Sequence, residues 1–185
     1  MEKAAGLEVP DEAVSIPQDD RCWSGSRNMK LSGGCQCGAV TFEMESRTPY
    51  PFMRCYCSIC RKVGGSAGYA INLMAAADSL KMKGEASKAF YHAMTDGKPS
   101  SAERHFCGSC GSHLWLWDPN WPELIHPHAG AIDSALPTPP ESVHIMLEFK
   151  PDWVDVPEGP GHVHFQRYPD LSIEDWHKSK GLYET

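Results

Sequence analysis

Hydrophobic and polar residues alternate in several short stretches of this sequence. Val40, Phe42 and Met44 form the first stretch, with the polar residues Thr41 and Glu43 between them. A period of two is typical of a strand that buries one face. The same pattern, or a similar composition, predicts further short strands at 69–73, 89–92, 113–117 and 143–149, and a turn with an edge strand at 78–84.

Long helices are not expected. The chain has 15 prolines and 16 glycines scattered along its length, and these residues favour turns and short strands. Near the end, Ser172 precedes two acidic residues and Trp176, which predicts an N-capped short helix over 172–177. The pattern therefore indicates a mainly β fold with short helices.

One folded domain with two extensions is the expected organisation. Residues 1–29 are rich in acidic residues and prolines and show little periodicity, which predicts a flexible N-terminal extension. The domain itself is expected over 30–155, and residues 156–185 are expected to form a C-terminal segment packed on it. Cys22 stands alone in the N-terminal segment, so we expect a free thiol without a role.

The charge and hydropathy of the sequence argue against some classes of binding partner and against a membrane span. The formal net charge is −7 and no block of Lys and Arg occurs, which argues against nucleic acid as the main ligand. The longest weakly polar run, 64–77, is shorter than the roughly 18 apolar residues that a spanning helix needs. Charged residues interrupt the first positions after Met1, where a signal peptide would have an apolar core, so a reducing cytosol or nucleus is expected, and we predict a cytoplasmic location.

The cysteines are the residues that best indicate the chemistry of this protein. Of eight cysteines, seven lie in three clusters. Cys55, Cys57 and Cys60 fall within six residues, and this spacing suits convergence on one metal ion. Three protein ligands leave one position open on a tetrahedral zinc, as in catalytic sites. The alternative is a distant fourth ligand that would make this zinc structural.

The remaining four clustered cysteines predict a second zinc site. Cys35 and Cys37 precede the first predicted strand, and Cys107 and Cys110 form a glycine-rich zinc knuckle. A metal held by both pairs would close a long loop, so its binding energy would become folding energy. We therefore expect two zinc ions per chain, one of them structural.

Three histidines follow the knuckle without joining either predicted zinc site. We expect His113 to be only hydrogen-bonded, because four thiolates beside it already complete a site. His126 and His128 lie two residues apart and could border a pocket. As zinc ligands these two are unconvincing, because the clustered thiols already account for two sites.

The cysteine motifs together resemble one family. They are Gly34-Cys35-Gln36-Cys37-Gly38-Ala39-Val40, Cys55-Tyr56-Cys57-Ser58-Ile59-Cys60-Arg61-Lys62 and Phe106-Cys107-Gly108-Ser109-Cys110-Gly111. In order and spacing these motifs resemble those of the glutathione-dependent formaldehyde-activating enzymes, a family that also includes centromere protein V. The resemblance covers about residues 30–155.

The resemblance implies a β-tent fold with a structural zinc on the four cysteines. It also implies a second zinc on Cys55, Cys57 and Cys60, where glutathione is joined to formaldehyde as S-hydroxymethylglutathione in a carbon–sulfur lyase reaction written in reverse. Many members have histidine where this chain has Tyr56, and that difference bears on the exact substrate rather than on the metal site.

Charge favours a thiol as the fourth ligand of the three-cysteine site. Zinc with three thiolates is a net monoanion of low Lewis acidity, which suits a soft ligand better than water. A coordinated substrate thiol would become the thiolate that attacks a carbonyl carbon. Arg61, with Lys62 and Arg54, is the candidate for attracting an anionic thiol such as glutathione, and a solvated turn is the alternative.

We therefore expect a zinc-dependent carbon–sulfur lyase that acts on a thiol adduct of a small aldehyde or related electrophile. The alternative is a non-catalytic zinc module that binds a protein or chromatin partner, although the acidic N-terminal segment would repel phosphates. A redox thiol switch is a third hypothesis, and it requires a metal-free central cluster. The sequence does not define the oligomeric state.

Overall fold

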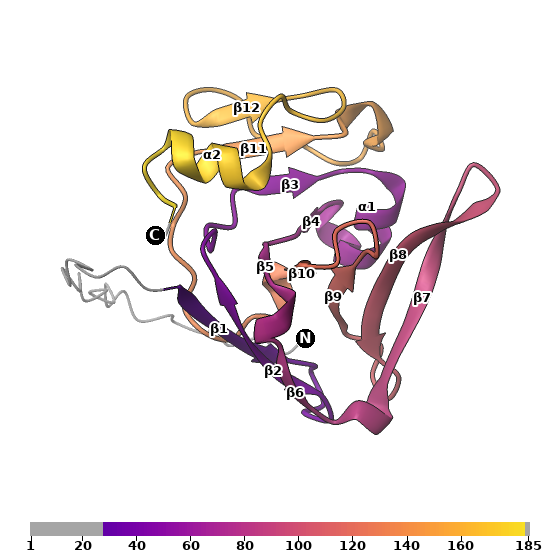
Figure 1. Ribbon diagram of the computed structural model, residues 1–185. Helices are drawn as coiled ribbons and strands as arrows, with labels where there is room; N and C mark the ends of the chain where they lie inside the picture. Colours follow the sequence, from indigo (N-terminus) through magenta and orange to yellow (C-terminus); the bar gives the residue numbers. More distant parts are fainter. Residues whose placement is uncertain (1–27, 184–185) are drawn as a thin grey trace, which may run out of the picture.

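The computed structural model describes residues 28–183, and this part of the chain is mainly β (Figure 1). Twelve strands form three sheets, and the α-helices are two short ones, so the predicted mainly β fold is confirmed. The three-stranded sheet has the order β1 (Met29–Gly34), β2 (Thr41–Ser46), β6 (Lys81–Lys83). The five-stranded sheet has the order β5 (Ala75–Ala76), β10 (Leu124–Pro127), β9 (His113–Trp117), β8 (Lys98–Cys107), β7 (Lys88–Thr95). The four-stranded sheet has the order β12 (His162–His164), β11 (Ser142–Ile145), β3 (Met53–Cys55), β4 (Ala70–Ile71).

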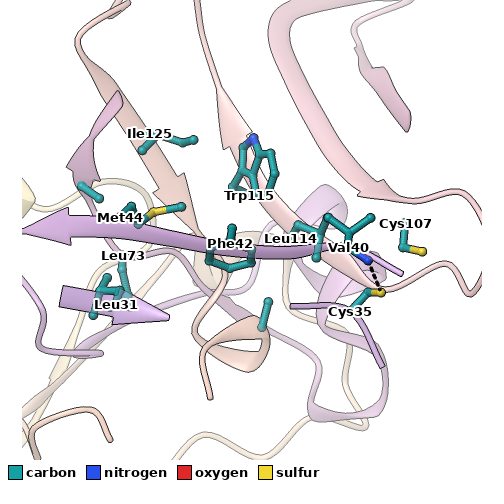
Figure 2. Packing of buried hydrophobic residues seen from close by; sticks show 12 residues of the cluster. Leu31, Cys35, Val40, Phe42, Met44, Leu73, Cys107, Leu114, Trp115 and Ile125 are labelled. Atoms are coloured by element: carbon teal, nitrogen blue, oxygen red, sulfur yellow. Dashed lines mark hydrogen bonds between the residues drawn. The ribbon is translucent and has the colours of Figure 1, made fainter. Parts of the chain in front are cut away.

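The larger core lies between the three-stranded and five-stranded sheets. Phe42 and Met44 of β2 are buried, as the alternation predicted, and Leu31 of β1 pairs with Met44 across the antiparallel register. Phe42 meets Trp115 of β9 edge to face, with ring centroids 5.3 Å apart. Figure 2 shows Cys35 and Cys107 at one end of this cluster. The hydrophobic core is therefore continuous with two of the predicted metal ligands.

The second core lies under helix α2 (Ile173–Ser179), which covers the four-stranded sheet in Figure 1. Trp176 stacks on Phe52 with ring centroids 3.6 Å apart and planes 3° from parallel. The hydroxyl of Ser172 accepts a hydrogen bond from the backbone N–H of Asp175, so the predicted N-cap is confirmed. In this sheet β11 runs parallel to both β3 and β12.

Two strand predictions were wrong in extent. The strand predicted over 143–149 ends at Ile145, because Met146 has a φ of 61° and a 3₁₀ turn follows over Leu147–Phe149. Of the strand predicted over 69–73, the structure has only Ala70–Ile71. The buried side chains of the predicted range are those of Ala70 and Leu73. The turn and edge strand at 78–84 and the strand at 113–117 are confirmed.

Several elements were not predicted: strands β1, β3, β5, β8, β10 and β12 and helix α1. Helix α1 (Ser58–Gly64) follows directly after Cys57, and β8 is a ten-residue strand that pairs with β7 and β9. The strand predicted at 89–92 is the first part of the longer β7. Within residues 28–183, no helix is long and apolar enough to cross a bilayer.

Candidate metal centres

Four cysteines from two distant turns meet at the end of the larger core. Cys35 and Cys37 lie between β1 and β2, Cys107 ends β8, and Cys110 lies in the turn before β9. Their Sγ atoms all lie within 4.8 Å of one another, with separations of 3.6 Å for Cys35–Cys37 and 3.8 Å for Cys37–Cys107. Cys35 and Cys107 are buried, whereas Cys37 and Cys110 are exposed. This four-cysteine group could hold a metal ion.

Backbone geometry prepares both turns for this convergence. The N–H of Val40 donates to Cys35 Sγ at 3.2 Å, as Figure 2 shows. On the other turn Gly111 has a φ of 77°, and its N–H donates to the carbonyl of Cys107 at 2.8 Å. Hydrogen bonds from Ser112 lower the pKa of the Cys110 thiol, whose sulfur lies 3.3 Å from the Ser112 hydroxyl. Such bonds favour the thiolate form that a metal requires.

Three cysteines form a second group where β3 passes into α1. Cys55 ends β3, Cys57 is the N-cap of α1, and Cys60 lies in the first turn of that helix. The Sγ of Cys57 accepts a hydrogen bond from the N–H of Cys60 at 3.4 Å. All three sulfurs lie within 4.8 Å of one another, and no fourth Cys, His, Asp or Glu of residues 28–183 joins this three-cysteine group. The group could hold a metal ion and leave one coordination position free of protein ligands.

The helix that carries this group depends on one glycine. A Cβ atom at Gly64 would clash with the backbone carbonyl of Tyr69, so only glycine lets α1 end against the chain that enters β4. Asn72, just after β4, donates from Nδ2 to Cys60 Sγ at 3.7 Å. Helix α1 and the segment that follows it therefore both contribute contacts to the sulfurs.

The thiols of the three-cysteine group influence one another's pKa. Hydrogen bonds from Cys55 and then Cys60 lower the pKa of the Cys57 thiol. Hydrogen bonds with Cys57 and Cys60, followed by burial, raise the pKa of Cys55. Close sulfurs cannot all be thiolates without a cation, and this repulsion favours occupation by a metal ion.

The basic residues that flank the group differ in their surroundings. Arg61 is half-buried with its Nε unpartnered, and Lys62 is exposed. The guanidinium of Arg54 lies over the ring of Tyr69 at 5.2 Å from its centroid. Tyr56 is fully buried, and its hydroxyl is 2.9 Å from Nδ1 of His144. Tyr56 is thus part of the packed interior, and Arg54 and Arg61 each keep a buried Nε without a hydrogen-bond partner.

The predicted histidines have three different environments. His126 bonds through Nδ1 to the carbonyl of Leu73 at 3.0 Å, and it is not part of the lining of the cavity that contains His128. His128 is buried with both ring nitrogens unpartnered, and His113 has an unpartnered Nδ1, contrary to the prediction of a simply hydrogen-bonded side chain. Both His113 and His128 line a cavity of about 360 Å³ beside α1, together with Tyr69. The expectation of a pocket-bordering histidine is therefore confirmed for His128 only.

Sequence reasoning missed Arg104, a buried cation. It lies on β8 with 8% of its surface exposed, and its Nε and Nη1 have no hydrogen-bond partner. No sequence signal distinguishes it, because it stands between charged and aromatic residues in a strand that the pattern did not predict. Cys22 lies outside the described residues.

Comparison with known proteins identifies the family. Residues 30–148 match the family model described as glutathione-dependent formaldehyde-activating enzyme, and this stretch contains all seven clustered cysteines. The chain belongs to this family. Its relatives include a Halomonas elongata protein named "Putative glutathione-dependent formaldehyde-activating enzyme", which is 56% identical over 156 residues, covering 84% of this chain and 99% of the relative.

One of the solved structures similar to this family member is that of a Rhodobacter sphaeroides protein. The two sequences are 28% identical, and the crystal structure of that protein superposes with a TM-score of 0.45. The match covers 59% of this chain and 92% of the other. Strand β12 and helix α2 lie beyond the residues matched by the family model. The family signature therefore covers both cysteine groups but not the C-terminal cover of the second core.

Proposed function

We propose that this family member is a zinc-dependent carbon–sulfur lyase of the S-(hydroxymethyl)glutathione synthase type. Its substrate would be a thiol, with glutathione as the first candidate, and a small aldehyde such as formaldehyde. The observation that carries the proposal is the three-cysteine group, which brings three sulfurs together without a fourth ligand from residues 28–183. A second, closed group of four cysteines supports a division into one structural and one reactive centre.

The sulfur geometry fits zinc. A tetrahedral zinc with Zn–S bonds of about 2.3 Å places neighbouring sulfurs about 3.8 Å apart. The separations of 3.6 Å and 3.8 Å in the four-cysteine group agree with that value. All seven described cysteines are free thiols in clusters, which supports a reducing, cytoplasmic setting.

Each group would have its own role. The four-cysteine group would tie the turn between β1 and β2 to the turn between β8 and β9, and so stabilise the larger core. In the three-cysteine group, zinc would supply a Lewis acid that lowers the pKa of a substrate thiol. Arg61, half-buried in the last turn of α1, would attract the anionic end of that thiol.

The reaction needs no redox partner. The substrate sulfur forms a bond to the carbonyl carbon, the π electrons of the C=O bond move to oxygen, and the proton lost by the thiol ends on that oxygen. Orientation of sulfur against carbonyl carbon is thus the main contribution required of the protein. The reverse path cleaves the carbon–sulfur bond, which is the lyase direction.

Metal content gives the first prediction. We expect about two zinc ions per chain, because the seven thiols divide into a closed and an open set. A mild chelator should remove the ion of the three-cysteine group first, since fewer protein ligands hold it. Elemental analysis during chelator titration checks this, and simultaneous loss of both ions would contradict the division.

Thiol binding tests the proposed function itself. In cobalt-substituted protein, glutathione should change the sulfur-to-metal charge-transfer band, because the open position favours a soft ligand. Arg61→Ala should weaken this binding by up to roughly 1.5–3 kcal/mol, and by less where solvent screens the contact, without changing metal content. Absence of a spectral change with any thiol would refute the mechanism.

A further inference from the structure

A chain of hydrogen-bonded side chains connects the C-terminal segment to the three-cysteine group. The hydroxyl of Tyr56 lies 2.9 Å from Nδ1 of His144, and Nε2 of His144 lies 3.0 Å from Nδ1 of His162. Tyr56 directly follows β3, His144 lies on β11, and His162 begins β12. Tyr56 and His144 are fully buried, whereas His162 is half-buried. The chain therefore runs from the protein surface to the residue between Cys55 and Cys57.

One arrangement of hydrogens satisfies both bonds. Among residues 28–183, Nδ1 of His144 is the acceptor that the hydroxyl of Tyr56 reaches. A neutral imidazole has one N–H donor and one acceptor, so the N–H of His144 lies on Nε2 and donates to His162. Burial, followed by the guanidinium of Arg54, lowers the pKa of His144 to about 4, and the ring is therefore uncharged at neutral pH. Both nitrogens of the buried His144 ring are satisfied in this way, as buried polar groups normally are.

Tyr56 is held at its ring and at its backbone. Side chains alternate in an extended segment, and the sulfurs of Cys55 and Cys57 converge, so the ring of Tyr56 points away from them. The backbone N–H of Tyr56 donates to the carbonyl of Ile145 at 3.0 Å. A residue fixed at both points leaves little freedom to the peptide units on either side of it. Those peptide units determine the directions of Cys55 and Cys57.

We propose that the two histidines of this chain are positioning residues, which act through Tyr56 and hold Cys55 and Cys57 in the geometry that binds a metal ion. The inference rests on the part of the proposed function that assigns a metal to the three-cysteine group. Residues that support metal ligands from outside the coordination sphere contribute roughly 10- to 100-fold to metal affinity. Strand β12 lies beyond the residues matched by the family model, so the C-terminal segment is part of this metal centre as well as of the second core.

The alternative is a purely structural role, in which the chain only stabilises the contact between β11 and β12. His164 is the reference for that role, because it is the cross-strand partner of His144 and the two rings stack with centroids 5.0 Å apart. Nε2 of His164 bonds to the carbonyl of Pro157 at 3.0 Å, so His164 lies outside the chain. A structural role predicts similar effects of changes at His162 and His164. A positioning role predicts weaker metal binding for changes within the chain alone.

The test is competition for zinc between the full-length protein and a chromophoric chelator, which resolves the two sites by their affinity. His162→Leu removes the acceptor at a similar side-chain size and should weaken the three-cysteine site about 10-fold, the lower end of the range, because His162 acts through other residues. The four-cysteine site is the internal reference and should not change. His162→Asn places an amide oxygen near the position of Nδ1 and should restore most of the affinity. His164→Leu is the matched control and should leave both affinities unchanged.

A second variant interrupts the chain at its other end. Tyr56→Phe keeps the ring and removes the hydroxyl, so it should weaken zinc binding at the three-cysteine site by a similar factor. The double variant Tyr56→Phe/His162→Leu should bind zinc no more weakly than Tyr56→Phe alone, because the chain is already broken. Tyr56→Phe also provides the test if the His162→Leu variant does not fold.

The outcomes separate this inference from the proposed function. If wild type binds a single zinc ion, the metal of the three-cysteine group is refuted, and the proposed function and the inference fail together. If wild type binds two, the inference alone is overturned by unchanged affinity in His162→Leu, by equal weakening of both sites, or by equal weakening in His164→Leu. Failure of His162→Asn to restore binding would overturn it as well. Additive losses in the double variant would show that Tyr56 and His162 act independently, which also contradicts the proposed chain.

Discussion

Replacing Cys107 by serine should leave most of the domain unfolded at room temperature. Cys107 is fully buried at the end of β8, and its sulfur lies 3.8 Å from that of Cys37, 70 residues away in the sequence. Structural zinc contributes roughly 10–16 kcal/mol in small zinc-finger peptides, which exceeds or equals the whole stability of most domains. Loss of one buried ligand should therefore cost on the order of 5 kcal/mol or more. Urea or thermal unfolding followed by circular dichroism measures the loss.

Cys57→Ser is the matched control for this change, because it also removes one thiolate. Cys57 is only partly buried, and its sulfur caps α1 by accepting the N–H of Cys60. Serine is among the best N-cap residues, so the helix should keep its start. The melting temperature should fall far less than in Cys107→Ser. Equal losses in the two variants would contradict the assignment of a structural and a reactive centre.

The parts of the structure that sequence could predict have strong local signals. Phe42 and Met44 alternate with polar residues, and one buried face follows directly from that pattern. Ser172 precedes acidic residues and forms the cap that its side chain predicts. The seven cysteines were grouped correctly because their spacing limits the ways in which thiols can share a metal.

The parts that sequence could not predict depend on distant contacts. Strand β8 carries Glu103, Arg104 and His105 in succession, so no hydrophobic alternation marks it, and its pairing with β7 and β9 defines it instead. Met146 adopts a left-handed conformation that ends β11, which is unusual for a non-glycine residue. Arg104 is buried although arginine is a mostly exposed residue type, so its position in the sequence alone does not reveal it.

The last prediction concerns catalysis, and Cys57→Ser should nearly abolish it while the domain remains folded. Serine keeps the helix cap, but its hydroxyl does not ionise near neutral pH, so it cannot replace a thiolate ligand. Loss of residues that merely orient metal ligands costs about 10- to 100-fold, so loss of a ligand should lower the rate at least ~100-fold. Exchange between ¹³C-formaldehyde and its glutathione adduct, measured by NMR above the uncatalysed rate, reports the activity.

Cys22→Ser provides the control at a cysteine outside the clusters, and it should keep both the rate and the metal content. Cys57→Ser should retain about one metal ion per chain, held by the four-cysteine group, which distinguishes loss of the reactive centre from general loss of metal. Wild-type exchange rates in Cys57→Ser would mean that the reaction does not use the three-cysteine group. In that case the group would serve another role, such as the non-catalytic binding of a partner, and the catalytic residues would have to lie elsewhere in the fold.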